Sequence, residues 1–167
     1  MALTSYQFRN QPYGLGFVFA GQAFTVSYRS MIKPGASLYI QISTGKDTIT
    51  HVTNRMITSQ IEQLGIKLIE NPWFEAGSEP IPVINLDGRS KIQAATSFYS
   101  DASNVYGGKI LEESMIPRCA FYGGSPVEST LYERILQYNT NYILAITNEG
   151  CHTNSTMVNT ALYESGN

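Results

Sequence analysis

Hydrophobic and polar residues alternate along several short stretches of the chain. Phe24, Val26 and Tyr28 alternate with polar residues, and the same period-two pattern recurs over residues 38–42 and 64–68. Because successive side chains of a β-strand point to opposite faces of a sheet, this alternation predicts half-buried strands. Further short candidate strands lie at residues 95–99, 109–112 and 158–163.

Two segments depart from simple alternation in informative ways. Residues 142–147 carry apolar side chains at both alternating sets of positions, which predicts a central strand buried on both faces. Residues 80–86 have an extended pattern but contain Pro80 and Pro82. Because proline cannot donate to a strand ladder, we expect this segment to be a sheet edge or a connection between strands.

Residues 51–65 allow two interpretations. Ile57, Ile61 and Leu64 have helical spacing, and Gly65 is suited to end a helix. The preceding residues 51–53 have β character, so a short helix and a pair of strands both remain open.

The strand pattern as a whole predicts an all-β fold with about 8–10 short strands separated by Gly, Pro and Asn turns. We expect a single-domain antiparallel β-sandwich, jelly-roll-like, over residues 23–167, although an immunoglobulin-like strand order gives the same spacing. Residues 1–22 lack a strand or helix pattern and are expected to form an extended arm that packs on a neighbour, with a frayed terminus as the alternative. The candidate partner-binding residues in this arm are Tyr6, Phe8, Arg9 and Tyr13.

Composition and charge exclude several classes of function. Charged residues make up 14% of the 167 residues, below the usual fraction of about 25%, and the formal net charge is −2. Lys and Arg residues are scattered, which argues against nucleic acid as a partner. No apolar run approaches the roughly 18 residues that span a membrane, and no secretory signal precedes the domain, so we expect synthesis in a cytoplasm.

Residues with catalytic or metal-binding chemistry are few. Cys151 and His152 are adjacent, but neighbours on a strand point to opposite faces, so this reasoning gives them no shared site. Glu112 and Glu113 are also neighbours whose side chains are expected to diverge, and we expect them on a solvated surface. Cys119 and Cys151 are too few and too far apart for a zinc motif, and two reduced thiols are favoured over a disulfide. The sequence therefore predicts no enzyme activity, no cofactor and no metal site.

An ordered series of short motifs runs from residue 23 to residue 164. It comprises an Ala-Phe-Thr strand, a Leu-x-Glu-x-Pro piece, an Asn-x-Asp-Gly-Arg-x turn, a Tyr-x-Asp piece, a Gly-Gly-x-Ile-Leu piece, an Arg-Ile-Leu segment that leads to Ile-Thr-Asn, and a Leu-Tyr-Glu ending, at residues 23–25, 68–72, 85–90, 99–101, 107–111, 134–148 and 162–164. In this order the chain resembles the small β-sandwich decoration or cement proteins of tailed bacteriophage heads. It departs from that pattern at Gly88, which is inserted into the turn, and at Leu162, where an aromatic residue is common.

This resemblance implies a non-catalytic virion protein, made in the host cytoplasm, that binds the outside of a phage capsid and stabilises it. The implied partners are the major capsid protein and further copies of the chain, as a trimer or dimer, without nucleic acid or membrane. Two rival functions remain open. One is a carbohydrate- or receptor-binding β-sandwich that uses Trp73 and some of the 11 tyrosines. The other is a cupin-like enzyme, although two histidines are few for its metal site.

Overall fold

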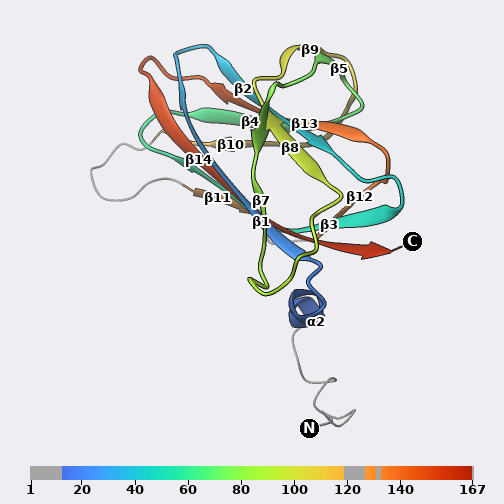
Figure 1. Cartoon of the computed structure of the whole chain (residues 1–167). Helices are drawn as coiled ribbons and strands as arrows, with labels where there is room; N and C mark the ends of the chain where they lie inside the picture. The colour runs from blue at the N-terminus through green and yellow to red at the C-terminus, as the bar shows by residue number, and fades with distance from the viewer. Residues whose placement is uncertain (1–12, 119–126, 131–132, 167) are drawn as a thin grey trace, which may run out of the picture.

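The chain forms a β-rich domain, described here from a computed structural model that covers residues 13–118, 127–130 and 133–166 (Figure 1). The described elements are one short helix and fourteen strands. They are α2 (Tyr13–Phe19), β1 (Ala23–Ile32), β2 (Ser37–Ser43), β3 (Thr48–Ser59), β4 (Leu64–Glu70), β5 (Trp73–Glu75), β6 (Glu79–Ile81), β7 (Val83–Asn85), β8 (Ser97–Ser100), β9 (Ser103–Tyr106), β10 (Lys109–Ile116), β11 (Val127–Thr130), β12 (Arg134–Leu136), β13 (Asn141–Asn148) and β14 (Asn154–Gly166). No helix among these residues is both long and apolar enough to cross a membrane.

Two antiparallel sheets pack against each other, which confirms the predicted β-sandwich. In the first sheet the strands lie in the order β11, β3, β14, β1, β7, and β12 pairs directly with another stretch of β3. In the second sheet the order is β10, β4, β13, β2, β8, β6. The short strands β5 and β9 form a separate two-stranded sheet.

The pairing of the strands is nested, and this settles the strand order that the sequence left open. β1 pairs with β14, β2 with β13, β3 with both β11 and β12, and β4 with β10. With β11 and β12 taken as one interrupted strand, these are the eight strands of a jelly roll, four in each sheet. The described strands outnumber the expected 8–10 because residues 73–106, between β4 and β10, add five short strands, and because β11 and β12 are separate.

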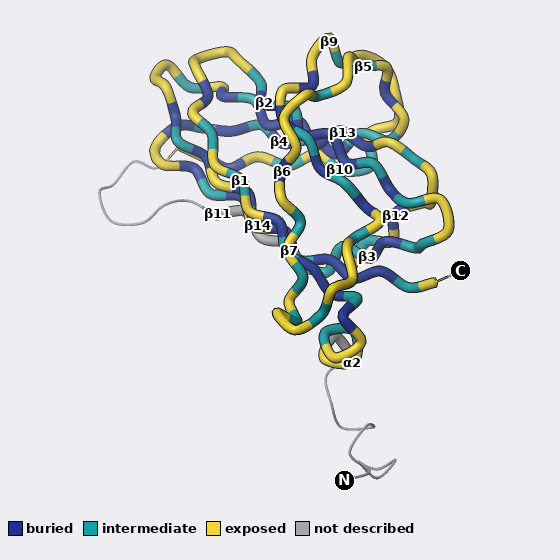
Figure 2. The backbone as a smooth tube through the Cα atoms, in the orientation of Figure 1, coloured by how far each residue is buried: buried dark blue, intermediate teal, exposed yellow. Residues whose placement is uncertain are grey.

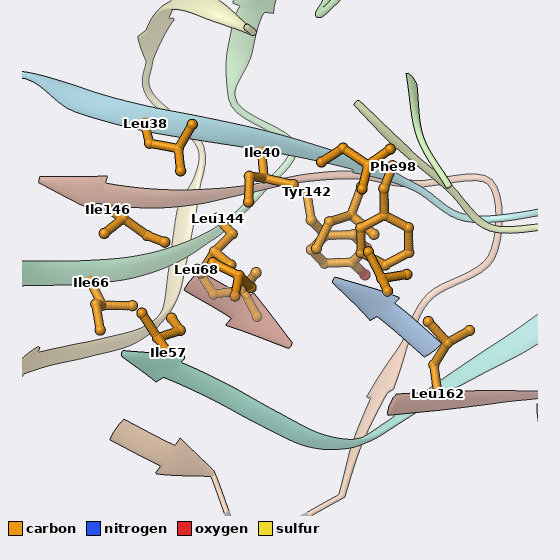
Figure 3. Close-up of a cluster of buried hydrophobic side chains, with 14 of the residues drawn as sticks. Leu38, Ile40, Ile57, Ile66, Leu68, Phe98, Tyr142, Leu144, Ile146 and Leu162 are labelled. Atoms are coloured by element: carbon orange, nitrogen blue, oxygen red, sulfur yellow. The ribbon is translucent and has the colours of Figure 1, made fainter. Parts of the chain in front are cut away.

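The main hydrophobic core lies between the two sheets, where inward-facing side chains of both meet (Figures 2 and 3). Ile57, Leu64 and Ile146 are completely buried there, and each contributes about 1.5–3 kcal/mol from its removal from water. The alternation of buried and exposed residues along β1 and β4 is the period-two pattern read in the sequence.

Strand β13 is buried on both faces, as predicted for residues 142–147. It pairs with β2 on one side and β4 on the other, so it lies centrally in its sheet. Leu144 and Ile146 point into the main core, whereas Ile143 and Ala145 belong to a second apolar cluster. Residues 73–106, which we call the insertion, cover this second cluster with Phe74 of the β5–β9 sheet and with residues near it.

The segment with two prolines connects the two sheets at their edges, which confirms the expectation for residues 80–86. β6 is an edge strand of the second sheet and β7 is an edge strand of the first, and Pro82 lies between them. Edge strands interrupted by proline are poor templates for pairing with further strands.

The ambiguous segment around Ile57 is a strand and not a helix. β3 runs through Ser59 and pairs with β14 along its length, so Ile57 lies in the core while Ile61 is 47% exposed in the following turn. Gly65 lies inside β4 and ends no helix. Pairing with β14 therefore decides this segment in favour of the strand.

The expectation of an extended segment over residues 1–22 is wrong for residues 13–19. These form α2, which ends at Phe19 and is followed by a turn that contains Gly21, whose φ of +70° lies in the left-handed region that glycine adopts without strain. The Phe17 ring stacks on Tyr163 of β14 with 4.1 Å between the ring centroids. This contact ties the helix to the end of the first sheet.

Candidate functional site

The outer face of the first sheet carries a diagonal stripe of methionines. Met157 of β14 lies opposite Arg29 on β1 and Thr58 on β3, so Met31 and Met56, two residues further along each neighbouring strand, are its diagonal neighbours. The three methionines, Met31, Met157 and Met56, are 61%, 40% and 36% exposed. We call this surface the methionine face.

The methionine face is nearly free of charge. Between the methionines lie short uncharged side chains such as Ser27 and Asn159, which hydrogen-bond to each other at 2.7 Å. Arg29 is the one charged side chain that the described parts of β1, β3 and β14 place there, and its Nε donates to Ser155 Oγ at 3.1 Å. A surface with flexible methionines and few charges can be buried against another protein at a small cost in desolvation.

The opposite end of the same outer face is covered by an aromatic stack. Tyr163 lies between Phe17 of α2 and His51 of β3, with ring centroids 4.4 Å apart in the His51 pair. Glu133 accepts a short hydrogen bond from the Tyr163 hydroxyl and lies 2.6 Å from His51 Nδ1. The Tyr163 hydrogen bond holds the pKa of Glu133 below its usual value; burial opposes this, and His51 adds to the lowering.

Glu133, His51 and Ser165 are arranged in the order of a hydrolytic triad. His51 Nε2 lies 3.3 Å from Ser165 Oγ, on the side of the ring opposite Glu133. However, Glu133 also binds Tyr163, and the His51 ring is held in the aromatic stack with Tyr163. Ser165 is the residue before the last in strand β14. It does not lie in the sharp strand-to-helix turn that exposes a nucleophilic serine in hydrolases. We therefore interpret this network as one that fastens α2 and Glu133 to the sheet.

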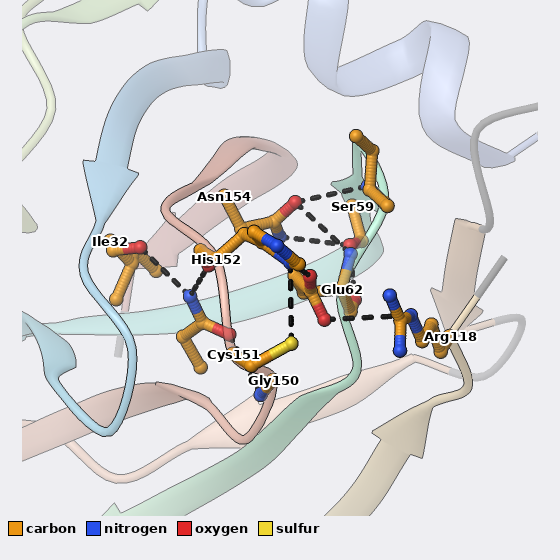
Figure 4. A network of polar contacts seen from close by, with 10 residues as sticks. Ile32, Ser59, Glu62, Arg118, Gly150, Cys151, His152 and Asn154 are labelled. Carbon is orange, nitrogen blue, oxygen red and sulfur yellow. Dashed lines mark hydrogen bonds and ion pairs between the residues drawn. The ribbon is translucent and has the colours of Figure 1, made fainter.

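A second polar cluster joins two loops at the other end of the sandwich (Figure 4). Glu62 lies in the turn between β3 and β4, and Cys151 and His152 lie in the loop between β13 and β14. His152 Nδ1 is 2.6 Å from Glu62 Oε1 and 3.2 Å from Cys151 Sγ. The sequence argument that placed Cys151 and His152 on opposite faces is wrong, because both residues lie in a loop and not on a strand.

Buried asparagines hold the two loops in place. Asn154 Oδ1 accepts from the backbone N–H groups of Ile61 and Glu62, which fixes the turn that carries the carboxylate. Asn148 is completely buried; its Nδ2 donates to the carbonyls of Ile32 and His152, and its Oδ1 accepts from the Gly150 N–H.

Gly150 lets the carboxylate of Glu62 approach the backbone closely. A Cβ atom at Gly150 would lie 2.0 Å from Glu62 Oε2, so a larger residue there would displace the acid. The Glu62 side chain is 1% exposed, and its Oε2 accepts no hydrogen bond among the described residues. The hydrogen bond from His152 holds the pKa of Glu62 below its usual value; burial opposes this, and the charge of Arg118 assists it.

The cluster does not have the geometry of a catalytic triad. Glu62 and Cys151 both approach His152 Nδ1, whereas a relay needs the acid and the nucleophile on different ring nitrogens. Because Nδ1 carries the proton that it donates to Glu62, this nitrogen cannot also accept the proton of the Cys151 thiol. What the arrangement offers is three donor atoms of different types that converge on one point.

Trp73 and Tyr106 form an exposed aromatic pair on the β5–β9 sheet. Their ring centroids are 4.6 Å apart, and the residues are 50% and 60% exposed. Beside them Ser103 Oγ donates to Glu75 at 2.9 Å. Because the rings stack on each other, each leaves only one face free for a ligand.

The interior of the sandwich holds a cavity too small for a substrate. It measures about 40 Å³ and is lined mainly by core side chains, with Arg55, Glu112 and Arg134 among the polar ones. Glu112 points inward to pair with Arg55, while Glu113 points outward to Lys67, 2.9 Å away, so the two acids diverge as expected. The expectation of a solvated surface holds for Glu113 but is wrong for Glu112, whose side chain is only 10% exposed. No histidine lines this cavity, so the described interior lacks the donors of a cupin metal site.

The candidate residues of the N-terminal segment are only partly placed by the structure. Tyr6, Phe8 and Arg9 lie outside the described residues, as does Cys119, and Tyr13 is the first residue of α2. Cys151 is a free, exposed thiol. The chain matches no protein-family model and no curated protein.

Proposed function

We propose that the protein is a non-catalytic virion structural protein that binds the outside of a phage capsid and stabilises it. The observation that carries this proposal is the methionine face, a nearly uncharged surface with three exposed methionines on the central strands β1, β14 and β3 of the first sheet. The motif series along residues 23–164, with its resemblance to phage decoration proteins, supports the identity of the partner as the major capsid protein.

The methionine face is suited to a repeated contact of moderate strength. Full burial of a methionine side chain contributes about 1.5–3 kcal/mol, and because the three methionines are 36–61% exposed in the free protein, roughly half of this is available from each. A decoration protein binds at many equivalent positions of one shell, where modest contacts add up to a large resistance to the internal pressure of packaged DNA. Because shells are symmetric, we propose that the protein binds as a trimer or dimer at a symmetry axis, on the capsid surface.

The test is co-sedimentation of the purified full-length protein with shells that lack it, with bound copies counted per shell. Saturable binding at a fixed ratio to the shell subunit is expected. Met157→Glu should weaken this binding by about tenfold or more, because a charge would be buried in the contact. Met115→Glu is the matched control, because Met115 is 56% exposed on β10 of the other sheet and should leave binding unchanged. Absence of binding to expanded shells, or equal loss in both variants, would overturn the proposal.

A carbohydrate- or receptor-binding role is the second candidate, and the exposed Trp73–Tyr106 pair favours it. Aromatic rings with a free face stack on the apolar faces of sugars, and the neighbouring Glu75 carboxylate can accept hydrogen bonds from hydroxyl groups. A glycan-array signal that disappears in Trp73→Ala, together with no binding to shells, would favour this function over the first.

A further inference from the structure

The cluster formed by Glu62, Cys151 and His152 is not used by the proposed function. One donor atom from each residue, a carboxylate oxygen, a thiol sulfur and an imidazole nitrogen, lies within 4.8 Å of the other two. The Glu62 carboxylate is almost completely buried, although its Oε2 has no hydrogen-bond donor among the described residues. The positive group nearest to that oxygen is the Arg118 guanidinium, whose Nε lies 3.7 Å away and makes no hydrogen bond with it, so a buried acid oxygen, a thiol and an imidazole converge at a point where the oxygen is not fully satisfied.

We propose that Glu62, Cys151 and His152 bind a divalent transition-metal ion, with Zn²⁺ as the best-fitting ion. Zinc accepts this mixture of sulfur, nitrogen and oxygen donors, whereas Mg²⁺ and Ca²⁺ prefer oxygen donors alone. Three protein ligands leave the fourth tetrahedral position open to water. This inference concerns a different end of the molecule from the methionine face and does not rest on the proposed function.

The donor atoms lie somewhat closer together than tetrahedral zinc requires, so the ligands must move apart slightly when an ion binds. Bond lengths of about 2.0–2.3 Å place two tetrahedral ligands roughly 3.3–3.5 Å apart. His152 Nδ1 and Cys151 Sγ are 3.2 Å apart, and Nδ1 and Glu62 Oε1 are 2.6 Å apart. The side chain of His152 is 69% exposed, so its ring can shift outward by the fraction of an ångström that an ion needs.

The groups behind the ligands resemble those that orient ligands in metal sites. The Glu62 turn is held by Asn154, and the loop with Cys151 and His152 is held by Asn148. Such supporting hydrogen bonds fix the direction of ligand side chains and raise metal affinity. On binding, the thiol proton passes to solvent and the imidazole proton moves from Nδ1 to Nε2 by exchange with solvent, so the ring binds as neutral imidazole while the thiolate and carboxylate neutralise the charge of the ion.

Arg118 occupies the position of a competing cation. Its Nε lies 3.7 Å from Glu62 Oε2, and its side chain is 57% exposed. Arg118 can therefore swing into solvent when an ion enters, but its charge opposes that entry. Removal of this charge should tighten metal binding, which a purely structural ion pair would not produce.

The bound ion would join the β3–β4 turn to the β13–β14 loop. The β3–β4 turn and the β13–β14 loop each connect a strand of the first sheet, β3 or β14, with a strand of the second sheet, β4 or β13. The ion would therefore hold one end of the sandwich closed. Because the ion binds only the folded chain, it raises the resistance of the protein to unfolding in proportion to its affinity and concentration.

The experiment titrates the metal-free, full-length protein with Co²⁺, a spectroscopic probe for zinc sites, and then displaces it with Zn²⁺. It is carried out in a Cys119→Ser background, in which Cys151 is the only thiol of the chain. We expect a thiolate-to-cobalt charge-transfer band and the visible bands of a tetrahedral site, at one ion per chain. Zinc should remove these bands and raise the melting temperature.

Matched variants decide the outcome. Cys151→Ser should abolish the charge-transfer band, and His152→Ala should weaken Co²⁺ binding by about tenfold or more, while both keep the circular dichroism spectrum of the fold, since both residues are exposed. Arg118→Gln should tighten binding. The proposal is overturned if no band forms in the Cys119→Ser protein, if Cys151→Ser keeps the band, or if zinc stabilises the His152→Ala variant as much as its parent.

Discussion

Truncation of Ile143 to alanine tests whether the β5–β9 sheet covers the outer face of the second sheet. Ile143 is completely buried, although its side chain points away from the main core. The change removes three carbon atoms, worth about 2.4 kcal/mol at roughly 0.8 kcal/mol each, and leaves a cavity beneath Phe74. We therefore expect a loss of about 2.5–4 kcal/mol in the free energy of unfolding, measured by urea denaturation.

The matched control is Ile110→Ala on β10. Ile110 is 50% exposed, and its truncation should cost less than about 1 kcal/mol. If Ile143→Ala is as mild as Ile110→Ala, then the insertion does not cover strand β13 in solution, and the reasoning about a second core is refuted.

Four further outcomes follow from the structure. Asn148→Ala removes three buried hydrogen bonds and should cost about 3 kcal/mol in urea denaturation, whereas Asn159→Ala, with one surface hydrogen bond, should cost less than about 1 kcal/mol; equal costs would contradict the role of Asn148. The pKa of Glu133 is lowered in the folded chain, so its ionised carboxylate stabilises the fold at pH values above the usual glutamate pKa. This contribution is lost as pH falls through the lowered pKa, so the difference in urea midpoint between the parent and Glu133→Gln should shrink on acidification. A difference that stays constant with pH would contradict this. A fluorophosphonate probe should leave Ser165 unlabelled, and labelling would show that the Glu133–His51–Ser165 network is catalytic. Tyr106→Ala should shift the emission of Trp73, the only tryptophan, to longer wavelength, because the indole loses its stacking partner, and unchanged emission would contradict the stack.

Much of the fold could be predicted because its strands obey the period-two rule. The alternation at Phe24 and Val26 marks a strand with one face in the core, and the two-sided apolar pattern around Leu144 marks the central strand. The predicted strands were too short at residues 109–112 and 158–163, since β10 continues to Ile116 and β14 runs from Asn154 to Gly166. The added residues of β14 are mainly polar, several of them buried, and their strand conformation comes from pairing with a neighbour.

Other features depend on contacts between segments far apart in the sequence. The helical spacing of Ile57 and Ile61 is an accident of a strand followed by a turn, and only the pairing of β3 with β14 resolves it. Helix α2 contains Gly14 and Gly16, which disfavour a helix, and its position depends on the stack of Phe17 on Tyr163.

The candidate sites were harder to predict than the fold. Glu62 has no local sequence signal, because it meets His152 only when β3–β4 and β13–β14 are folded side by side. The asparagines on either side of the Cys-His pair, Asn148 and Asn154, were an available hint that these residues lie in a loop. The methionine face is invisible in sequence, since its three residues become neighbours only through the register of β1, β14 and β3.

The most direct test of the proposed function is an electron cryomicroscopy reconstruction of expanded shells saturated with the protein, compared with shells that lack it. We expect additional density on the outer surface, at a fixed set of symmetry-related positions, into which the jelly roll fits with Met31, Met56 and Met157 against the shell. No additional density, or density in which the methionine face points to solvent, would contradict the proposal.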